Sequence, residues 1–380
     1  MDKKIRYLER SIKEDLTEKM VFLGGPRQVG KTTLALHVLG GDKSHEAYMN
    51  WDDVHAKPKI MRGVLPAADK LVVFDEIHKY SRWRGLIKGF FDKRFPEQSF
   101  LVTGSARLDY YRKGGDSLLG RYHYYRLHPF SIPELGADMG TKDVEQLLRF
   151  GGFPEPFLKG SEVAWRRWQR ERLERVINID LRDLEHVKEI SLVELLVEAL
   201  PARVGSPLSV KNLREELGVA HDTVERWLKI LENMYVVFRL PPFGASRIKA
   251  VKKEQKLYFW DWSQCIDEGA RFENMVACHL LKYCHYHEDT LGHKMELRYI
   301  RDIEGREVDF VVLKDKKPLF AVECKTGERN LSRHLYYFSE RMDVPVFYQT
   351  HAGGADFVPG DSKKLRMIPF SRLCREIHGV

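Results

Sequence analysis

Three apolar stretches in the first third of the chain each end in small or acidic residues. They read MVFLGG from residue 20, KLVVFDE from residue 70 and SFLVTGSA from residue 99. Continuous apolar runs of this length are typical of strands in a parallel sheet that is covered on both faces. We therefore predict a doubly wound α/β domain with its ligand site at the carboxyl ends of the strands.

The middle of the chain has helical periodicity. Residues 163–202 read as helix, and residues 208–244 predict two helices, a strand and a sharp turn. Ser209 is suited to cap the first of these two helices, and Gly218 marks the turn between them. The second helix places Val224, Trp227, Leu228 and Leu231 at core spacing, and its other face carries His221, Thr223, Arg226 and Lys229. The pattern predicts a winged helix, which either binds DNA or serves as a packing module.

The last third contains a predicted β-hairpin with charged residues on one face. Its strands, residues 308–313 and 319–324, are separated by the polar segment KDKKP. A hairpin centred on this segment pairs Leu313 with Leu319, Val311 with Ala321, and Asp309 with Glu323. Because side chains alternate along a strand, Lys325 shares the face of Glu323. Directly opposed like charges repel, so the pattern predicts a positive group between the two carboxylates.

Composition adds broad limits. The chain has 380 residues, of which 43% are apolar, so it is long enough for two or three domains. Lys and Arg number 63 against 55 Asp and Glu, an excess that permits a nucleic-acid partner and equally fits a solvated surface. Five scattered cysteines and a charged amino terminus predict a cytoplasmic protein with reduced thiols. No apolar run approaches the ~20 residues that span a bilayer, so no membrane partner is expected.

The first apolar stretch leads into a glycine-rich motif of the form GxxxxGK[ST]. Its predicted nucleotide-binding residues are Gly25, Pro26, Arg27, Gln28, Val29, Gly30, Lys31, Thr32 and Thr33. The glycines let the backbone curl so that its N–H groups surround phosphate oxygens, and the following helix presents its positive end to the anion. We expect Lys31 to reach the β- and γ-phosphates of ATP and Thr32 to bind Mg²⁺.

Polar residues at the ends of the other two strands complete the predicted ATP site. Asp75 fits a Mg²⁺-linked aspartate, because two acids at the end of a core strand are costly unless a metal or water uses them. Glu76 fits the base that orients the attacking water. Ser105 is placed to sense the γ-phosphate, although an ordinary turn serine fits its position as well.

Three arginines follow the third strand and are candidates for an arginine finger. They are Arg107, Arg112 and Arg121. Arg121 precedes a predicted strand and is the first candidate, because an arginine that reaches the nucleotide of a neighbouring subunit stabilises transition-state charge. The sequence does not separate the three, and each also fits an ordinary surface arginine.

Taken in order, these motifs resemble those of bacterial and archaeal AAA-type ATPases that carry a C-terminal restriction-endonuclease-like domain. The resemblance covers nearly the whole chain and rests on GGPRQVGKTTL, VVFDEIHK, LVTGSA, LLGRYHYYRLHPFS, GGFPEPFL, the winged-helix stretch, KLYFWD, FENMVACHLL and GREVDFVV…AVECKTG. It implies a P-loop ATPase domain at residues 1–155, a helical and winged-helix domain at 156–245, and a nuclease-like α/β domain at 246–380. It also implies a homo-oligomeric ring, such as a hexamer, that acts on DNA.

The last domain resembles a PD-(D/E)xK nuclease core. Asp309 matches the first acid, although proline does not precede it, and Glu323 and Lys325 match the E-x-K. The resemblance implies that Asp309 and Glu323 bind Mg²⁺ or Mn²⁺, and that Lys325 orients a water or stabilises the developing charge. It implies Glu273, on the preceding helix, as a further catalytic residue that holds a second metal or a water.

Two functions fit this pattern. The first is an ATP-driven DNA-processing protein that combines a ring ATPase with a Mg²⁺-dependent nuclease acting on duplex, branched or single-stranded DNA. The second is a nucleotide-controlled switch whose nuclease-like domain binds DNA or protein without cutting. The set of Asp309, Glu323 and Lys325 favours the nuclease, because an exposed salt bridge worth ~0–1 kcal/mol leaves the opposed acids unexplained.

Overall fold

The computed structural model of the chain describes residues 6–66, 69–104, 108, 118, 120–136, 141–177, 189–244, 255–327, 330–360 and 362–378. Its contacts divide the chain into two compact units, Met1–Pro129 and Phe130–Val380. The division into three domains, with boundaries after residues 155 and 245, stays a prediction. Within the described ranges, no helix is both long enough and apolar enough to cross a membrane.

The first unit is built on a five-stranded parallel sheet with the strand order β2-β3-β4-β1-β5. Its strands are β1 (Met20–Gly24), β2 (Tyr48–Asn50), β3 (Leu71–Asp75), β4 (Ser99–Thr103) and β5 (Tyr122–Arg126). The α/β class and the three strands predicted for this region are confirmed. Because the strands are parallel, the carboxyl ends of β1, β3 and β4 lie on one edge of the sheet, with β4 between the other two.

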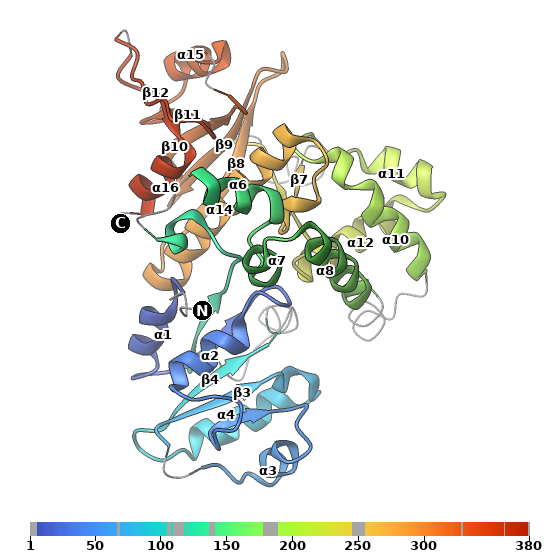
Figure 1. The fold of residues 1–380 in the computed structure, drawn as a ribbon, viewed down its shortest axis with the longest axis vertical. Helices are drawn as coiled ribbons and strands as arrows, with labels where there is room; N and C mark the ends of the chain where they lie inside the picture. Colours follow the sequence, from blue (N-terminus) through green and yellow to red (C-terminus); the bar gives the residue numbers. More distant parts are fainter. Residues whose placement is uncertain are drawn as a thin grey trace. The chain divides into compact units, whose positions relative to one another are not determined.

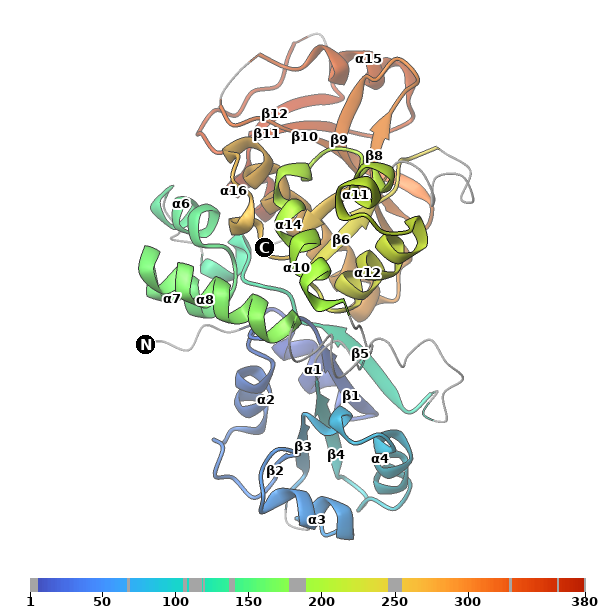
Figure 2. The ribbon, with the colours of Figure 1, turned by 90° about the vertical axis from the view of Figure 1, so that its right-hand side faces the viewer.

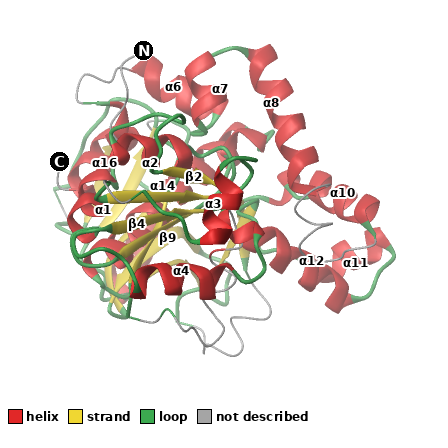
Figure 3. Cartoon of the chain, turned by 90° about the horizontal axis from the view of Figure 1, so that it is seen from below, coloured by secondary structure: helices red, strands yellow, loops and turns green. Residues whose placement is uncertain are grey.

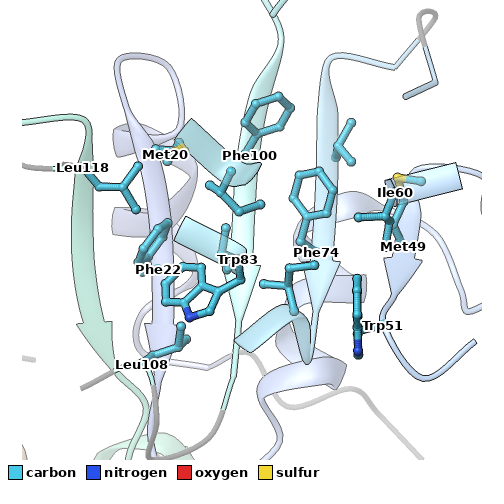
Figure 4. Close-up of a cluster of buried hydrophobic side chains, with 14 of the residues drawn as sticks. Met20, Phe22, Met49, Trp51, Ile60, Phe74, Trp83, Phe100, Leu108 and Leu118 are labelled. Atoms are coloured by element: carbon cyan, nitrogen blue, oxygen red, sulfur yellow. The ribbon is translucent and has the colours of Figure 1, made fainter. Parts of the chain in front are cut away.

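Helices cover both faces of this sheet. They are α1 (Glu9–Asp15), α2 (Lys31–Leu39), α3 (Ala56–Arg62) and α4 (Trp83–Asp92), with the short 3₁₀ helix η1 (Ile77–Lys79). Figure 3 shows α2 and α4 on opposite sides of β4. On one face, Phe22, Phe74 and Phe100 pack with Trp83 of α4 (Figure 4). Leu23, which alternation turns to the other face, is also fully buried. Burial on both sides explains why these strands are apolar throughout.

The second unit begins with a helical region. Its elements are η3 (Ile132–Leu135), α6 (Thr141–Phe150), α7 (Pro154–Lys159), α8 (Glu162–Arg175), α10 (Ile190–Ala199), η5 (Pro201–Arg203), α11 (Val210–Leu217) and α12 (His221–Asn233). Ser209 caps α11 by accepting a hydrogen bond from the Asn212 amide at 3.2 Å, and Gly218, with φ of 66°, ends it. The predicted helix pair is therefore α11 and α12.

A two-stranded antiparallel sheet follows the helix pair. It consists of β6 (Val237–Leu240) and β7 (Lys256–Phe259). Figure 2 shows α10, α11 and α12 gathered beside β6. The core residues predicted on α12, including Trp227 and Leu228, are fully buried. The predicted helices and strand are present, and the winged-helix interpretation of them stays a prediction.

The chain ends in a mixed five-stranded sheet with the order β12-β11-β10-β9-β8. Its elements are η6 (Trp262–Gln264), α14 (Glu268–Leu291), β8 (Met295–Arg301), β9 (Glu307–Lys314), β10 (Lys317–Cys324), α15 (Arg333–Arg341), β11 (Phe347–His351), β12 (Leu365–Pro369) and α16 (Phe370–His378). Figure 1 shows α15 on one face of this sheet and α14 with α16 on the other. The helix α14 packs against β8, β9 and β10.

The turn of the β9–β10 hairpin differs from the sequence prediction. The predicted five-residue loop is a two-residue turn at residues 315–316, with φ values of 51° and 70°. Leu313 pairs with Pro318 rather than with Leu319, and a bulge beyond Pro318 restores the predicted register from Val311 onward. The prediction was wrong at the turn because two-residue turns with positive φ match the twist of the strands. The bulge then absorbs the one-residue difference.

Candidate functional site

Residues 25–33 form the loop between β1 and α2 together with the first turn of α2. Gly25 has φ of 135°, and a Cβ atom at this position would clash with the carbonyl oxygen of Leu127. Gly30, with φ of 98°, is the N-cap of α2. Both positions require glycine, since residues with a side chain rarely adopt such conformations. The loop thus turns sharply and presents the amino end of α2, with its positive partial charge, at the carboxyl edge of the sheet.

Lys31 is held inside this loop by backbone oxygens. Its Nζ donates to the carbonyl of Gly25 at 2.9 Å and to that of Pro26 at 2.7 Å. These bonds keep the positive charge at the centre of the loop. Arg6, which no sequence motif marks, braces the loop by donating from its guanidinium to the carbonyl of Val29 at 2.8 Å. Such a brace joins distant segments and leaves no local signal in the sequence.

Asp75, at the end of β3, accepts hydrogen bonds from three hydroxyl groups. Thr32 Oγ1 donates to Oδ2 of Asp75 at 2.9 Å, and Tyr48 Oη donates to the same oxygen at 2.6 Å. Thr103 Oγ1 donates to Oδ1. The structure therefore brings together Thr32 and Asp75, and it adds Tyr48 and Thr103 as new members of the site. Burial and the hydrogen bond to Asp75 raise the pKa of Tyr48, so its hydroxyl remains a donor.

The oxygen atoms around Asp75 fit a magnesium ion. The Thr32 hydroxyl and the Asp75 carboxylate are hard ligands of the kind that Mg²⁺ prefers, and Mg²⁺ usually also binds waters and substrate phosphates. Asp75 is only 2% exposed, and a carboxylate at this depth is costly unless hydrogen bonds satisfy it. The three hydroxyl donors meet this requirement and hold the carboxylate in one orientation.

Glu76 follows Asp75 in a strained backbone conformation. Its φ of 57° and ψ of 17° lie in the left-handed region, which residues other than glycine rarely adopt. Its Oε2 is buried without a hydrogen-bond donor among the described residues, and Lys79 Nζ and His78 Nε2 lie 3.6 Å and 3.7 Å away. Burial raises the pKa of Glu76, against the opposing charge of Lys31. A buried carboxylate of raised pKa next to a phosphate loop is suited to accept a proton.

The predicted sensor and finger residues have different outcomes. Ser105, Arg107 and Arg112 lie outside the described residues. Arg121 immediately precedes β5, and its Nε donates to Oδ1 of Asp92 at 3.1 Å. Because β5 runs parallel to β1, Arg121 lies at the amino edge of the sheet, opposite the phosphate loop. It does not reach the phosphate loop of its own subunit, and only the role toward a neighbour stays open.

A buried lysine lies among the acids of the C-terminal sheet. Lys256, the first residue of β7, is 1% exposed. Its Nζ lies 3.3 Å from Oε1 of Glu273 on α14 and 3.6 Å from Oδ1 of Asp309 on β9, and it also pairs with Glu307. Tyr258 Oη donates to the same oxygen of Glu273 at 2.7 Å. Lys256 therefore supplies a positive group beside Asp309, which the hairpin pattern required without identifying its source.

The structure brings Asp309, Glu323 and Lys325 together at the carboxyl end of β10. The amide of Cys324 donates to Oδ2 of Asp309 at 2.8 Å, and Lys325 Nζ donates to Oε1 of Glu323 at 2.6 Å. Burial raises the pKa of Glu323, and the charge of Asp309 raises it further. The same two causes raise the pKa of Glu273. These carboxylates are close enough to need cations if they are to be charged together.

The metal predictions for these acids separate into two cases. Asp309 and Glu323 offer hard oxygens of the kind that Mg²⁺ prefers, and Mg²⁺ commonly takes only one or two protein carboxylates. Glu273, in contrast, already accepts hydrogen bonds from Lys256 and Tyr258 at Oε1, and its predicted use to hold a second metal or a water stays a prediction. Among the described residues, no group of three or more His, Cys, Asp and Glu side chains could hold a metal ion. The metal role of Asp309 and Glu323 stays a prediction.

Comparison with family models supports the reading of the phosphate loop. Residues 17–136 match a model described as an AAA domain. This part of the chain is therefore similar to AAA domains. Residues 141–265 and 268–369 match two models described as domains of unknown function, DUF8612 and DUF4143. Neither of these two matches bears on the winged-helix or nuclease-like interpretation.

Similar proteins occur in bacteria and archaea. An uncharacterised protein of Mycobacterium tuberculosis is 25% identical over 244 residues, which cover 64% of this chain and 54% of that protein. The chain thus spans about half the length of the mycobacterial relatives that it matches. An uncharacterised protein of Methanocaldococcus jannaschii is 22% identical over 370 residues, covering 88% of this chain and 81% of that protein. Among solved structures, the Holliday junction branch migration motor RuvB of Thermotoga maritima aligns with 62% of this chain and 86% of that chain, at 18% identity and a TM-score of 0.30.

Proposed function

We propose that the AAA domain hydrolyses ATP and that hydrolysis drives work on DNA by the rest of the chain. The observation that carries ATP hydrolysis is the position of Glu76, a buried carboxylate beside Asp75 and the phosphate loop. In this mechanism the loop amides and Lys31 bind the phosphates. A Mg²⁺ ion at Thr32 and Asp75 supplies neutralisation of the phosphate charge. Glu76 orients the attacking water and accepts its proton.

The substitution Glu76→Gln tests this assignment, because it keeps the shape of the side chain and removes its basicity. We expect nucleotide binding, measured with a fluorescent ATP analogue, to persist. Steady-state hydrolysis should fall by ~10²-fold or more. Lys31→Ala should instead weaken nucleotide binding itself. Near-wild-type hydrolysis by Glu76→Gln would remove Glu76 from the mechanism.

For the second unit we propose Mg²⁺- or Mn²⁺-dependent cleavage of DNA at Asp309, Glu323 and Lys325. The observation that supports it is the meeting of these three side chains at the carboxyl end of β10. A divalent ion at Asp309 and Glu323 supplies polarisation of the scissile phosphate. Lys325, whose ammonium lies 2.6 Å from Glu323, orients the attacking water.

A nucleotide-controlled binding switch is the second candidate for this unit. Lys256 favours it, because acids already paired with a buried lysine do not need a metal to be held in the fold. The two candidates are separated by incubating labelled single-stranded, duplex and branched DNA with the protein in Mg²⁺ or Mn²⁺, with and without ATP. The nuclease predicts cleavage by the wild type and none by Asp309→Ala, with ATP hydrolysis unchanged. If the wild type never cuts, or the variant cuts equally, the binding switch replaces the nuclease.

Three further features support the proposed partners and the proposed location. Arg226 and Lys229 are exposed on α12, where a winged helix would contact DNA. The place of Arg121, at the sheet edge away from its own phosphate loop, supports a homo-oligomeric ring in which each arginine serves a neighbour. The five cysteines, all within the described part of the chain, form no disulfide, which supports a cytoplasmic location.

A further inference from the structure

Lys256 occupies the centre of the carboxylate cluster in the second unit. This cluster consists of Glu273 on α14 and of Glu307 and Asp309 on β9. The ammonium pairs with all three, at 3.3 Å from Glu273 and 3.6 Å from Asp309, and its side chain is 1% exposed. A buried ammonium is stable only when carboxylates surround it, and each of these acids in turn relies on it. Burial lowers the pKa of Lys256, but the three carboxylates outweigh burial, and the net direction is upward.

One carboxylate oxygen of Glu273 already has two hydrogen-bond donors. Oε1 accepts hydrogen bonds from Lys256 at 3.3 Å and from Tyr258 at 2.7 Å, and these two residues share one face of β7. On the other side, the backbone of Gly205 lies so close that a Cβ atom there would be 2.9 Å from Oε2. Oε1 of Glu273 is therefore occupied by a lysine and a tyrosine, and an ion between Glu273 and Asp309 would have to displace Lys256.

Resting on the metal site proposed above for Asp309 and Glu323, we propose that Lys256 is a built-in cation that takes the place of a second metal ion. In this arrangement Glu273 and Glu307 hold the lysine, and the lysine holds Asp309 in position. Asp309 uses Oδ1 toward Lys256 and Oδ2 toward the Cys324 amide, so its orientation is fixed before any ion arrives. Lys256 is thus a positioning residue, and the site binds one divalent ion.

An ion bound between Glu273 and Asp309 would meet the lysine directly. Mg²⁺ binds oxygens at ~2.1 Å, and the ammonium already lies within 3.6 Å of an oxygen of each acid. Two cations cannot share this space, because their repulsion is strong in a buried site. Removing the positive charge of Lys256 should therefore open a second ion site, which the wild type lacks.

The test counts bound Mn²⁺ by electron paramagnetic resonance in the nucleotide-free, full-length chain. Asp309→Asn serves as the reference, so that any ion at the phosphate loop is subtracted. We expect the second unit to bind one Mn²⁺ ion in the wild type and two in Lys256→Met. Lys256→Arg keeps the charge and should bind one. Lys282→Met is the matched control, since Lys282 is another buried lysine, 3% exposed and paired with Glu134, and its loss should leave the count at one.

A second variant keeps the test decisive if Lys256→Met does not fold. Glu273→Gln should leave the Mn²⁺ count and affinity within ~2-fold of the wild type, because Glu273 faces a lysine rather than an ion. Two ions in the wild type, or a loss of Mn²⁺ in Glu273→Gln, would overturn the role of Lys256. No ion in the wild type but one in Lys256→Met would support Lys256 as the resident cation while ending the proposal of a metal-dependent nuclease. No ion in either protein would overturn both.

Discussion

The hydrogen bond from Tyr48 to Asp75 should be needed for Mg²⁺-dependent ATP hydrolysis, and the substitution Tyr48→Phe tests this. The substitution keeps the ring and removes one hydroxyl, which donates to Oδ2 of Asp75 at 2.6 Å. Hydrogen bonds to charged groups contribute ~1.5–3 kcal/mol each, so the free energy of unfolding of the first unit should fall by about this amount. Thr32 and Thr103 still donate to Asp75, so the loss should not unfold the unit.

The effect on catalysis should exceed the effect on stability. Partners that orient a metal-linked carboxylate typically change metal affinity or activity by ~10–100-fold when removed. The assay is steady-state ATP hydrolysis titrated with Mg²⁺, combined with amide hydrogen exchange of peptides from β1 and β3 to measure local stability. We expect Tyr48→Phe to raise the half-saturating Mg²⁺ concentration, or to lower turnover, by ~10–100-fold.

Tyr125→Phe is the matched control for this experiment. Tyr125 lies on β5 of the same sheet, and its hydroxyl donates to Oδ2 of Asp15 at 2.6 Å. It therefore loses a tyrosine–carboxylate hydrogen bond of the same length, but its partner Asp15 is not part of the predicted Mg²⁺ site. Both variants should lose similar stability, but only Tyr48→Phe should change the Mg²⁺ dependence. Identical Mg²⁺ curves for the two variants would refute the reasoning.

Three other predictions concern the ATP site, assembly and DNA. Burial raises the pKa of Glu76 above its ordinary value of 4.5, so its contribution to stability is fully present below that value and is lost as the pH rises through the raised pKa. Glu76→Gln should thus gain stability relative to the wild type as the pH rises, and a constant difference in Tm from pH 4 to pH 8 would contradict this. Arg121→Ala should lower hydrolysis by ~10³-fold or more, and mixing it with Lys31→Ala should partly restore activity at mixed interfaces; intact mixed oligomers without rescue would count against a finger in trans. Replacing Arg226 and Lys229 together by Ala should weaken DNA binding and flatten its salt dependence by ~2 phosphate contacts, whereas an unchanged slope would make the helix pair a packing module.

Much of the fold could be predicted from local patterns in the sequence. The parallel strands, the phosphate loop and the helix pair each depend on residues close together in the chain, such as Gly30 before α2 or Ser209 before α11. Periodicity and capping act over a few residues, so they can be recognised without knowing the rest of the structure. The prediction of the hairpin turn was wrong because the turn type and the bulge together set the register. A polar segment alone does not show which residues form the turn.

The missed residues are those that tertiary contacts bring to the site. Tyr48 begins a strand, where tyrosine is common for reasons of packing, and nothing nearby marks it as a donor to Asp75. Lys256 is the first residue of the strand KLYF, and a lysine at the end of a strand is usually exposed. Its three carboxylate partners come from positions 273, 307 and 309, so its burial follows only from the packing of β7 against α14 and β9.

Lys256 and its carboxylate partners come from different regions of the sequence, and this affects how the chain can be truncated and how it can evolve. The lysine and Tyr258 belong to the region that matches one family model, residues 141–265, and the acids belong to the region that matches another, residues 268–369. A fragment cut at this boundary would expose three acids to one another without their cation. Recombination that exchanged only one of the two regions would carry the same defect. The two regions should therefore be inherited together, and a fragment that reports faithfully on this cluster has to begin before β6.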